Sequence, residues 1–225
     1  MKLIADLSKF ERILWLTSVC TIIGAFLLSG DDILTIIASL IGVTALIFVA
    51  KGYVAGQILT IIFAVFYGII SYFFRYYGEM ITYLCMTAPI AAITVVSWLK
   101  HPYEGTKEVK VSRLTRASIT IMLLSAIAVT IAFYFILKAL GNTNLLFSTI
   151  SITTSFIASY LTFCRSPYYA IAYAANDIIL IILWTLATLE TFSYFPMVVC
   201  FIMFFLNDLY GFHNWEKMHH RQQKN

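Results

Sequence analysis

Charge is scarce in this sequence. Only 12% of its 225 residues are charged, about half of the ~25% share from which soluble domains build a charged surface. Cysteine is scarce too, and all four cysteines lie in apolar runs, which excludes a secreted disulfide-rich domain. The net charge of +4 is small and the basic residues form short patches, which excludes a disordered or nucleic-acid-binding protein.

Apolar residues, in contrast, make up 61% of the chain. A helix of roughly 20 apolar residues crosses the hydrocarbon core of a bilayer. Eight stretches fit this length, at 13–29, 33–50, 53–74, 79–99, 117–140, 145–163, 169–189 and 194–210. The run IILIILW at 178–184 is apolar on every side, whereas the strands of a membrane barrel alternate. The sequence therefore predicts an all-α integral membrane protein with eight transmembrane helices.

The basic residues predict the orientation of these spans. If the N-terminus is cytoplasmic, eight spans return the C-terminus to the same side, and all but two of the 15 Lys and Arg residues then lie inside. The exceptions are Arg75 and Lys138, and the acidic pair Asp31–Asp32 falls outside. We therefore expect a multi-pass protein with both termini cytoplasmic. A signal peptide is the alternative for the first segment, although no convincing small-x-small cleavage site precedes Asp31.

The sequence also contains a weak internal repeat. A shift of 117 residues aligns four pairs of bulky residues without a gap, namely Tyr67 with Trp184, Tyr77 with Tyr194, Met80 with Met197 and Trp98 with Trp215. The shift equals four spans, so the related units have the same direction across the membrane. The repeat predicts two parallel three-helix bundles joined by an inverter helix, which is the 3+1+3 arrangement of SWEET-like transporters.

The spans and the repeat together predict the organisation of the chain. The predicted parts are an additional N-terminal transmembrane helix (1–30), a first three-helix bundle (31–99), a cytoplasmic basic loop (100–116), an inverter helix (117–140), a second three-helix bundle (141–212) and a cytoplasmic tail (213–225). Two similar bundles leave a seam near the middle of the membrane, and rocking exposes that seam to each side in turn. This organisation favours a transporter.

Few amide or acidic side chains interrupt the spans, and such residues by default mark a site or a pathway. They are Gln57, Asn176, Asp177, Asn207 and Asp208. At 100° per residue, Gln57 belongs to a semi-polar stripe of its helix, and Asp177 shares a face with Trp184. Trp184 lies deep within its span, away from the interface where tryptophan anchors helices. We therefore expect Trp184 to face a ligand.

Several of the polar and aromatic residues also have a purely structural interpretation. Gln57 can form a hydrogen bond between two helices, and Asp208 can lie at the solvated end of its span. Trp98 and Trp215 are expected in the interfacial aromatic belt, with a solvated tail after Trp215. Pro89 removes one helical hydrogen bond and predicts a kink toward the seam.

No motif for enzymatic chemistry occurs in the sequence. It has no phosphate-binding G-x-x-x-x-G-K-[ST] loop, and its four histidines lack metal-binding spacing. No serine or cysteine has a histidine at the same membrane depth to activate it. We therefore expect a protein that is not an enzyme and has no cofactor or metal. The alternative, a membrane-embedded enzyme or sensor for a lipid, needs acidic or histidine residues clustered at one membrane surface, whereas the loop 100–116 is mainly basic.

Three segments of the chain resemble a known family. They are KGYVAGQILTIIFAVFYGIISYFFRYYGE (51–79), AYAANDIILIILW (172–184) and FFLNDLYGFHNWEK (204–217), and the N-D-x-Y-G-F-x-N-W pattern of the last is the most specific. In these segments the chain is similar to the PnuC family of bacterial vitamin transporters, from about residue 33 onward. The resemblance implies the 3+1+3 fold, with the first span as the additional helix of some members. Residues 91–98 (AAITVVSW) depart from the family because the aromatics that often precede this tryptophan are missing.

The resemblance implies import of nicotinamide riboside across the bacterial cell membrane by facilitated diffusion through alternating access, followed by trapping through cytoplasmic phosphorylation. Thiamine, riboflavin and deoxynucleosides are the alternative substrates. By position, the substrate contacts that the resemblance implies are Gln57, Asn176, Asp177, Trp184, Asn207 and Tyr210. The implied partners are this small molecule and the lipid bilayer, with no nucleic acid, while a homo-oligomer is left open.

The chemistry of nicotinamide riboside agrees with these residue types. Its cationic ring suits the face of Trp184, where a cation–π contact is worth about 0.5–2 kcal/mol. Asp177 has no obvious basic partner in a neighbouring span, so its carboxylate can balance the charge of the ring. Amides such as Asn176 suit ribose hydroxyls because they both donate and accept hydrogen bonds. Thiamine is also cationic and passes the same test.

Overall fold

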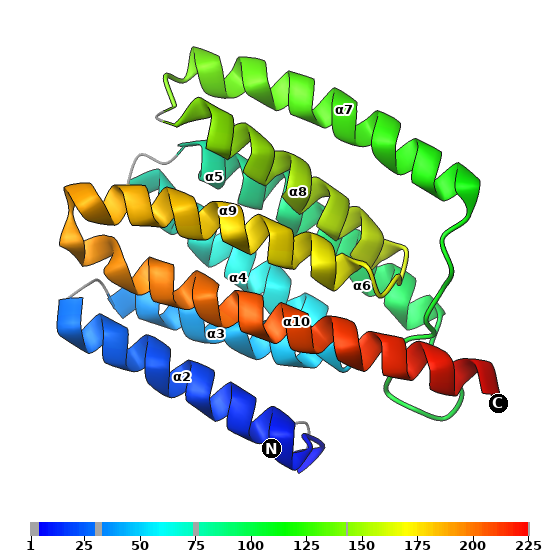
Figure 1. Ribbon diagram of the computed structural model, residues 1–225. Coiled ribbons are helices and arrows are strands. Elements are labelled where there is room, and N and C mark those ends of the chain that lie inside the picture. The colour runs from blue at the N-terminus through cyan, green and yellow to red at the C-terminus, as the bar shows by residue number, and fades with distance from the viewer. Residues whose placement is uncertain (1–4, 30–32, 74–76, 143, 225) are drawn as a thin grey trace.

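The computed structural model describes residues 5–29, 33–73, 77–142 and 144–224, and Figure 1 shows them as a bundle of long helices. The elements are α2 (Lys9–Ser29), α3 (Ile33–Ala50), α4 (Val54–Phe73), α5 (Tyr77–Ile81), a π-helical turn η1 (Thr82–Thr87), α6 (Ala88–Lys100), α7 (Arg116–Ala139), α8 (Leu145–Phe163), α9 (Tyr169–Glu190), a short 3₁₀ turn η2 (Phe192–Tyr194) and α10 (Phe195–Lys224). Among these residues, eight helical segments are long and apolar enough to cross a membrane, with α5, η1 and α6 forming one of them. The predicted all-helical fold with eight spans is confirmed, while the predictions for Arg75 and Asp31–Asp32 fall outside the described residues.

The helices pack in two groups. Helices α3, α4 and α6 form one group, and α8, α9 and α10 form the other. The groups meet where α3 contacts α10 and α6 contacts α8, whereas α7 lies outside against α8, and α2 lies on the opposite side against α3 and α10 (Figure 1). The division of the chain into bundles 31–99 and 141–212 stays a prediction. The 3+1+3 repeat itself stays a prediction.

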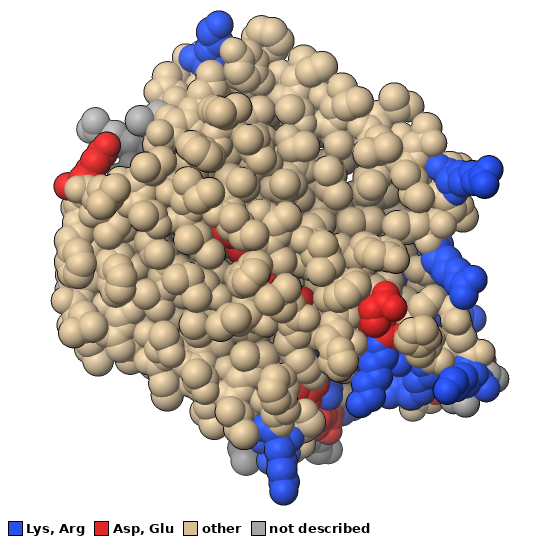
Figure 2. Space-filling model, viewed as in Figure 1, with Lys and Arg blue, Asp and Glu red and all other residues tan. Residues whose placement is uncertain are grey.

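Charged residues gather at one end of an otherwise apolar surface. Figure 2 shows Lys and Arg mainly toward the end of the bundle that holds both termini in Figure 1. Lys51 directly follows α3 and Lys100 ends α6 at this end, whereas Lys138 lies in the last turn of α7 at the other end. We call the end with Lys51 and Lys100 the basic end. Between the two ends, the exposed side chains of α2 and α7 are largely apolar, as lipid contact requires.

The span of α5 and α6 is not a regular helix. Thr82–Thr87 form a π-helical turn, and Pro89 follows in the first turn of α6. Proline has no N–H to donate to the carbonyl of Cys85, and a wider turn accommodates the missing bond. The kink toward the seam stays a prediction. Tyr83 and Thr87 from this turn face the space between the two helix groups.

At the basic end, the connection after α6 packs against the end of α10. The Val109 N–H donates to the Gly52 carbonyl at 2.9 Å. Gln222 accepts from the Val111 N–H at 2.8 Å and donates to the Val109 carbonyl at 3.1 Å. The described residues 213–224 of the expected tail are therefore helical, with one side packed and the other exposed. Helix α10 continues to Lys224, because the connection covers its apolar side.

Candidate substrate site

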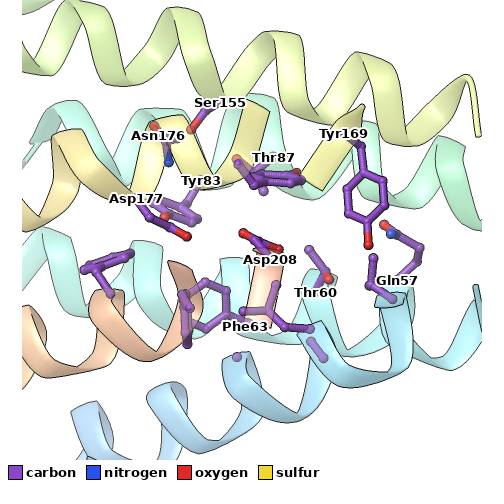
Figure 3. Close-up of a pocket in the computed structure, with 17 residues that line it drawn as sticks. Gln57, Thr60, Phe63, Tyr83, Thr87, Ser155, Tyr169, Asn176, Asp177 and Asp208 are labelled. Atoms are coloured by element: carbon purple, nitrogen blue, oxygen red, sulfur yellow. The ribbon is translucent and has the colours of Figure 1, made fainter. Parts of the chain in front are cut away.

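A cavity lies between the two helix groups, near the middle of the bundle, with a volume of about 70 Å³. Three phenylalanines, Phe63, Phe201 and Phe204, form part of its apolar wall together with small residues of α3. Its polar lining residues, drawn in Figure 3, are Gln57, Thr60, Tyr83, Thr87, Ser155, Tyr169, Tyr173, Asn176, Asp177 and Asp208. Apolar walls with a few convergent polar groups are the usual form of a small-molecule site.

Two carboxyl groups meet in this cavity. Asp177 of α9 and Asp208 of α10 are 4% and 3% exposed, and their side chains lie within hydrogen-bonding contact. Figure 3 shows the Asp177 carboxyl directed toward Asp208. No Lys, Arg or His is among the described residues that line the cavity. The prediction that Asp208 lies at a solvated helix end is wrong, because α10 continues for several turns beyond it.

Asn176 lies beside this acidic pair and is fixed by the neighbouring helix. Its side-chain oxygen accepts hydrogen bonds from the hydroxyls of Ser151 at 3.0 Å and Thr154 at 2.9 Å, both on α8. In Figure 3 the amide nitrogen of Asn176 points into the cavity. The amide is thus oriented to donate to a ligand before any ligand binds.

Gln57 of α4 lines the cavity toward the basic end. It is 3% exposed and lies close to Tyr169 in Figure 3. It also lines a second, smaller cavity together with Ser159, Thr162 and Tyr173 of the other helix group. Gln57 therefore lies where the two groups meet, as expected for a residue that contacts a ligand in the seam.

Trp184 lies beyond the cavity, on the side away from the basic end. It is 5% exposed, forms a hydrogen bond with Tyr67, and contacts Tyr194 with ring centroids 5.8 Å apart. The Tyr67 hydroxyl donates to Glu79 at 2.5 Å. The ring centroid of Tyr67 lies 4.5 Å from that of Tyr83, which is part of the cavity wall. Trp184 is therefore in the aromatic layer behind the wall rather than in the wall itself.

Asn207 and Tyr210 face helix α2 instead of the cavity. The Asn207 amide donates to the Ser18 hydroxyl at 3.0 Å, and the Tyr210 hydroxyl donates to Glu11 at 2.8 Å. Consecutive residues of a helix are about 100° apart, so Asp208 faces the cavity while Asn207 faces α2. Of the six substrate contacts implied by the resemblance, the structure brings three together in the cavity wall, namely Gln57, Asn176 and Asp177.

Two tryptophans close the basic end of the seam. Trp98 and Trp215 are 1% and 0% exposed, with ring centroids 5.5 Å apart. The Trp98 indole donates to the Thr162 carbonyl at 3.1 Å, and the Trp215 indole to the Val49 carbonyl at 2.9 Å. Their predicted place in the interfacial belt is therefore wrong. The ring centroids of Tyr169 and Trp215 are 4.9 Å apart, and Tyr169 also lines the cavity. The aromatic layer formed by Trp98, Trp215 and Tyr169 therefore separates the cavity from the basic end.

Sequence reasoning did not place Asp208, Tyr83 or Ser155 in the site. The run FIMFFLND (201–208) held a signal for Asp208, because a carboxyl directly after so apolar a run is costly to bury without a role. The hydroxyl-rich run STISITTS (148–155) held one for Ser155. Tyr83 gave no such signal, because the π-helical turn changes the phase from which helix faces are predicted.

Among the described residues, eight helical segments are long and apolar enough to cross a membrane, and six of them form two groups with a polar cavity between them. This architecture is that of a membrane transporter. The chain belongs to the nicotinamide mononucleotide transporter family, whose model matches residues 32–217. This is a family of transporters, so the prediction that the protein is not an enzyme is confirmed.

Two relatives carry the name nicotinamide riboside transporter PnuC. The protein of Neisseria mucosa (strain ATCC 25996 / DSM 4631 / NCTC 10774 / M26) is 26% identical over 198 residues, which cover 86% of this chain and 75% of the relative. That of Haemophilus influenzae (strain ATCC 51907 / DSM 11121 / KW20 / Rd) is 25% identical over 199 residues, covering 87% and 84%. The crystal structure of the vitamin B3 transporter PnuC has the same fold, with a TM-score of 0.83, 24% identity, and coverage of 96% of this chain and 94% of that one. The resemblance to the PnuC family is confirmed.

Proposed function

We propose that this protein imports nicotinamide riboside across the bacterial cell membrane by facilitated diffusion. The names of the two relatives support this substrate. The observation that carries the proposal is the cavity between the helix groups, which offers two carboxyl groups, two amides and several aromatic rings without a basic residue among its described lining. A cationic aromatic ring attached to a ribose needs these groups.

Each of the predicted contact residues has a role in this proposal. Asp177 provides negative charge for the ring, while the amides of Asn176 and Gln57 bind the ribose or the carboxamide. Trp184 lies behind the cavity wall, on the side away from the basic end. From there it controls access to the site from the outside of the cell. Asn207 and Tyr210 act indirectly, by holding α10 against α2 through their hydrogen bonds.

The same cavity argues against a phosphorylated substrate, despite the name of the family. A phosphate group carries up to two negative charges and is bound in proteins by Arg, Lys or clustered backbone N–H groups. The cavity instead presents Asp177 and Asp208, which repel a phosphate. The charge of the lining therefore supports the riboside over the mononucleotide as the substrate.

In the proposed orientation, the basic end and both termini are cytoplasmic. The two helix groups act as parallel three-helix bundles that rock about the cavity, with α7 as the inverter helix. Import then requires opening of the aromatic layer around Trp98 and Trp215, which closes the basic end. Phosphorylation in the cytoplasm would keep the released riboside inside the cell, because the phosphorylated product no longer fits the cavity.

Uptake by the purified protein in liposomes tests this function. Radiolabelled nicotinamide riboside should enter, and unlabelled riboside should compete, whereas nicotinamide mononucleotide, riboflavin and a deoxynucleoside should not. Imposed proton or sodium gradients should leave the uptake unchanged. Accumulation driven by either gradient would contradict facilitated diffusion, and absence of riboside uptake would contradict the proposed substrate.

Thiamine is the second candidate substrate. The acidic pair favours it as well, since its thiazolium ring carries a permanent positive charge. The two candidates differ in the groups around the ring, because only the riboside has sugar hydroxyls for Asn176 and Gln57. Competition by thiamine stronger than that by unlabelled riboside would identify thiamine as the substrate.

A further inference from the structure

The carboxyl groups of Asp177 and Asp208 lie together in a place where carboxyl groups are expensive. Both side chains are more than nine-tenths buried, and no hydroxyl or amide donor among the described residues reaches Asp177 Oδ2. Other buried carboxyl groups of this protein have such donors, as when Glu11 accepts from Lys51 and Tyr210. A buried carboxyl oxygen without a donor destabilises the folded protein, so its presence in a cavity indicates a ligand.

Among the described residues, none near the pair provides a positive charge. The titratable side chains near Asp177 are Asp208, Tyr83, Tyr173 and Cys200, and those near Asp208 are Asp177, Tyr169 and Tyr173. All of these groups are neutral or acidic. The missing counter-charge must therefore come from a proton or from the molecule that enters the cavity.

The contact between the two carboxyl groups limits the charge of the pair. Two buried carboxyl groups in contact repel each other strongly if both are ionised, so the charge state that suits a single bound cation is one proton and one negative charge shared by the pair. One positive charge neutralises such a pair completely. A neutral ligand would leave it uncompensated, and an anion would be repelled.

We infer that Asp177 and Asp208 together form a single-charge anionic site that selects substrates bearing one positive charge. This inference rests on the proposed function and makes it more specific: the charge of the ring, more than the sugar or the carboxamide, decides which molecule binds. Asp208, which is absent from the predicted contacts, is then a specificity-determining residue equal in weight to Asp177.

A pair of ligands that differ almost only in charge tests this inference. Nicotinamide riboside has a cationic ring, and its reduced form, dihydronicotinamide riboside, has the same sugar and carboxamide on a neutral ring. Binding of both to the purified full-length protein is measured by calorimetry. We expect the wild-type protein to bind the cationic form at least about tenfold more tightly, which corresponds to about 1.4 kcal/mol.

The variants Asp208→Asn and Asp177→Asn should each reduce this preference to less than about threefold. Both ligands are measured on the same sample, so partial unfolding lowers the amount of active protein equally for both and leaves the ratio of the two Kd values intact. Glu216→Gln is the matched control, because it removes one carboxylate from α10 outside the cavity. Its ratio should equal that of the wild type.

The possible outcomes separate this inference from the proposed function. Equal binding of the two forms by the wild type would overturn the charge selection and leave riboside transport standing. A cationic preference that survives in both Asn variants would also overturn it, since the selection would then come from other residues. Binding of thiamine but of neither riboside would contradict the proposed substrate and still support the single-charge site.

Discussion

Trp98 and Trp215 each donate an indole hydrogen bond to the helix group opposite to their own. Trp98 belongs to the group of α3, α4 and α6, and its acceptor, the Thr162 carbonyl, is on α8. Trp215 belongs to the group of α8, α9 and α10, and its acceptor, the Val49 carbonyl, is on α3. The two rings touch at the crossing point. The predicted repeat aligns these two tryptophans, and the structure places both at the same end of the seam.

Removal of either indole N–H should loosen the basic end. Trp98→Phe and Trp215→Phe each keep an aromatic ring and lose one hydrogen bond, which costs about 0.5–1.5 kcal/mol. Because each bond joins the two groups, we expect the seam to open more often. The measurement is the rate at which a membrane-impermeant maleimide modifies Ser159→Cys, a buried position in the seam, in a background without the four native cysteines.

The control for this experiment is Trp15→Phe. The Trp15 indole donates to Thr44 at 3.1 Å and joins α2 to α3, outside the seam between the groups. Its loss should lower the thermal unfolding midpoint by a similar amount without faster labelling of Ser159→Cys. Equal labelling in all three variants and in the parent would show that the tryptophans do not hold the seam closed.

Glu11 is expected to be the main attachment of α2 to both helix groups. Its carboxylate accepts from Lys51 at 3.1 Å and from Tyr210 at 2.8 Å, and its side chain is 3% exposed. Glu11→Gln leaves the Lys51 ammonium without its partner, which costs roughly 3 kcal/mol for a buried pair. The expected result is a clearly lower thermal unfolding midpoint in detergent.

The ion pair between Asp6 and Lys107 provides the comparison. It joins residues before α2 to the connection after α6, and its Lys107 and Asp6 side chains are 57% and 35% exposed. Solvent screens such a pair and replaces it easily. Asp6→Asn should therefore leave the midpoint nearly unchanged. If Asp6→Asn and Glu11→Gln lowered the midpoint equally, the buried contacts of Glu11 would not anchor α2.

The spans of this fold could be predicted from the sequence because membrane insertion depends on local composition. A helix such as α7 needs only a long apolar run, and its bounds differ from the predicted 117–140 by one residue at each end. The burial of Trp98 and Trp215 could not be predicted in this way. An interfacial tryptophan and a tryptophan that closes a seam occupy the same position at a helix end, and only the packing of distant helices distinguishes them.

Candidate site residues could be predicted on a helix that has a single polar face. Asn176 and Asp177 lie on a helix whose polar side chains meet the cavity, and helical periodicity is enough to place both on that side of the helix. Helix α10 has two polar faces, since Asp208 meets the cavity while Asn207 and Tyr210 meet α2. Periodicity separates these two faces but does not say which of them meets a ligand, because the neighbours of α10 are far away in the sequence.

Substitution by alanine should change the stability of the protein in opposite directions at two glycines, Gly56 and Gly24. A Cβ at Gly56 would collide with the backbone nitrogen of Val49 and lie 2.7 Å from its Cγ2, because α3 and α4 approach closely there. Gly56→Ala should therefore cost about 1–3 kcal/mol through overpacking. At Gly24 a Cβ would meet nothing within 4 Å. Gly24→Ala should stabilise α2 by about 0.5–1 kcal/mol. Thermal unfolding compares the two, and tolerance of alanine at Gly56 would contradict the close approach.

Gln57 and Asn207 are both buried amides that the family resemblance implies as substrate contacts, but they should differ in what they do. Gln57 lines the cavity, so Gln57→Ala removes a direct hydrogen-bonding partner and should raise the Kd for nicotinamide riboside about tenfold. Asn207 instead donates to Ser18 and to the Met203 carbonyl. Asn207→Ala should therefore lower the unfolding midpoint and change the Kd less than about twofold. Calorimetric titration and thermal unfolding of both variants give the comparison. A Kd that rises equally in both would show that the ligand-bound protein turns the Asn207 face of α10 toward the substrate.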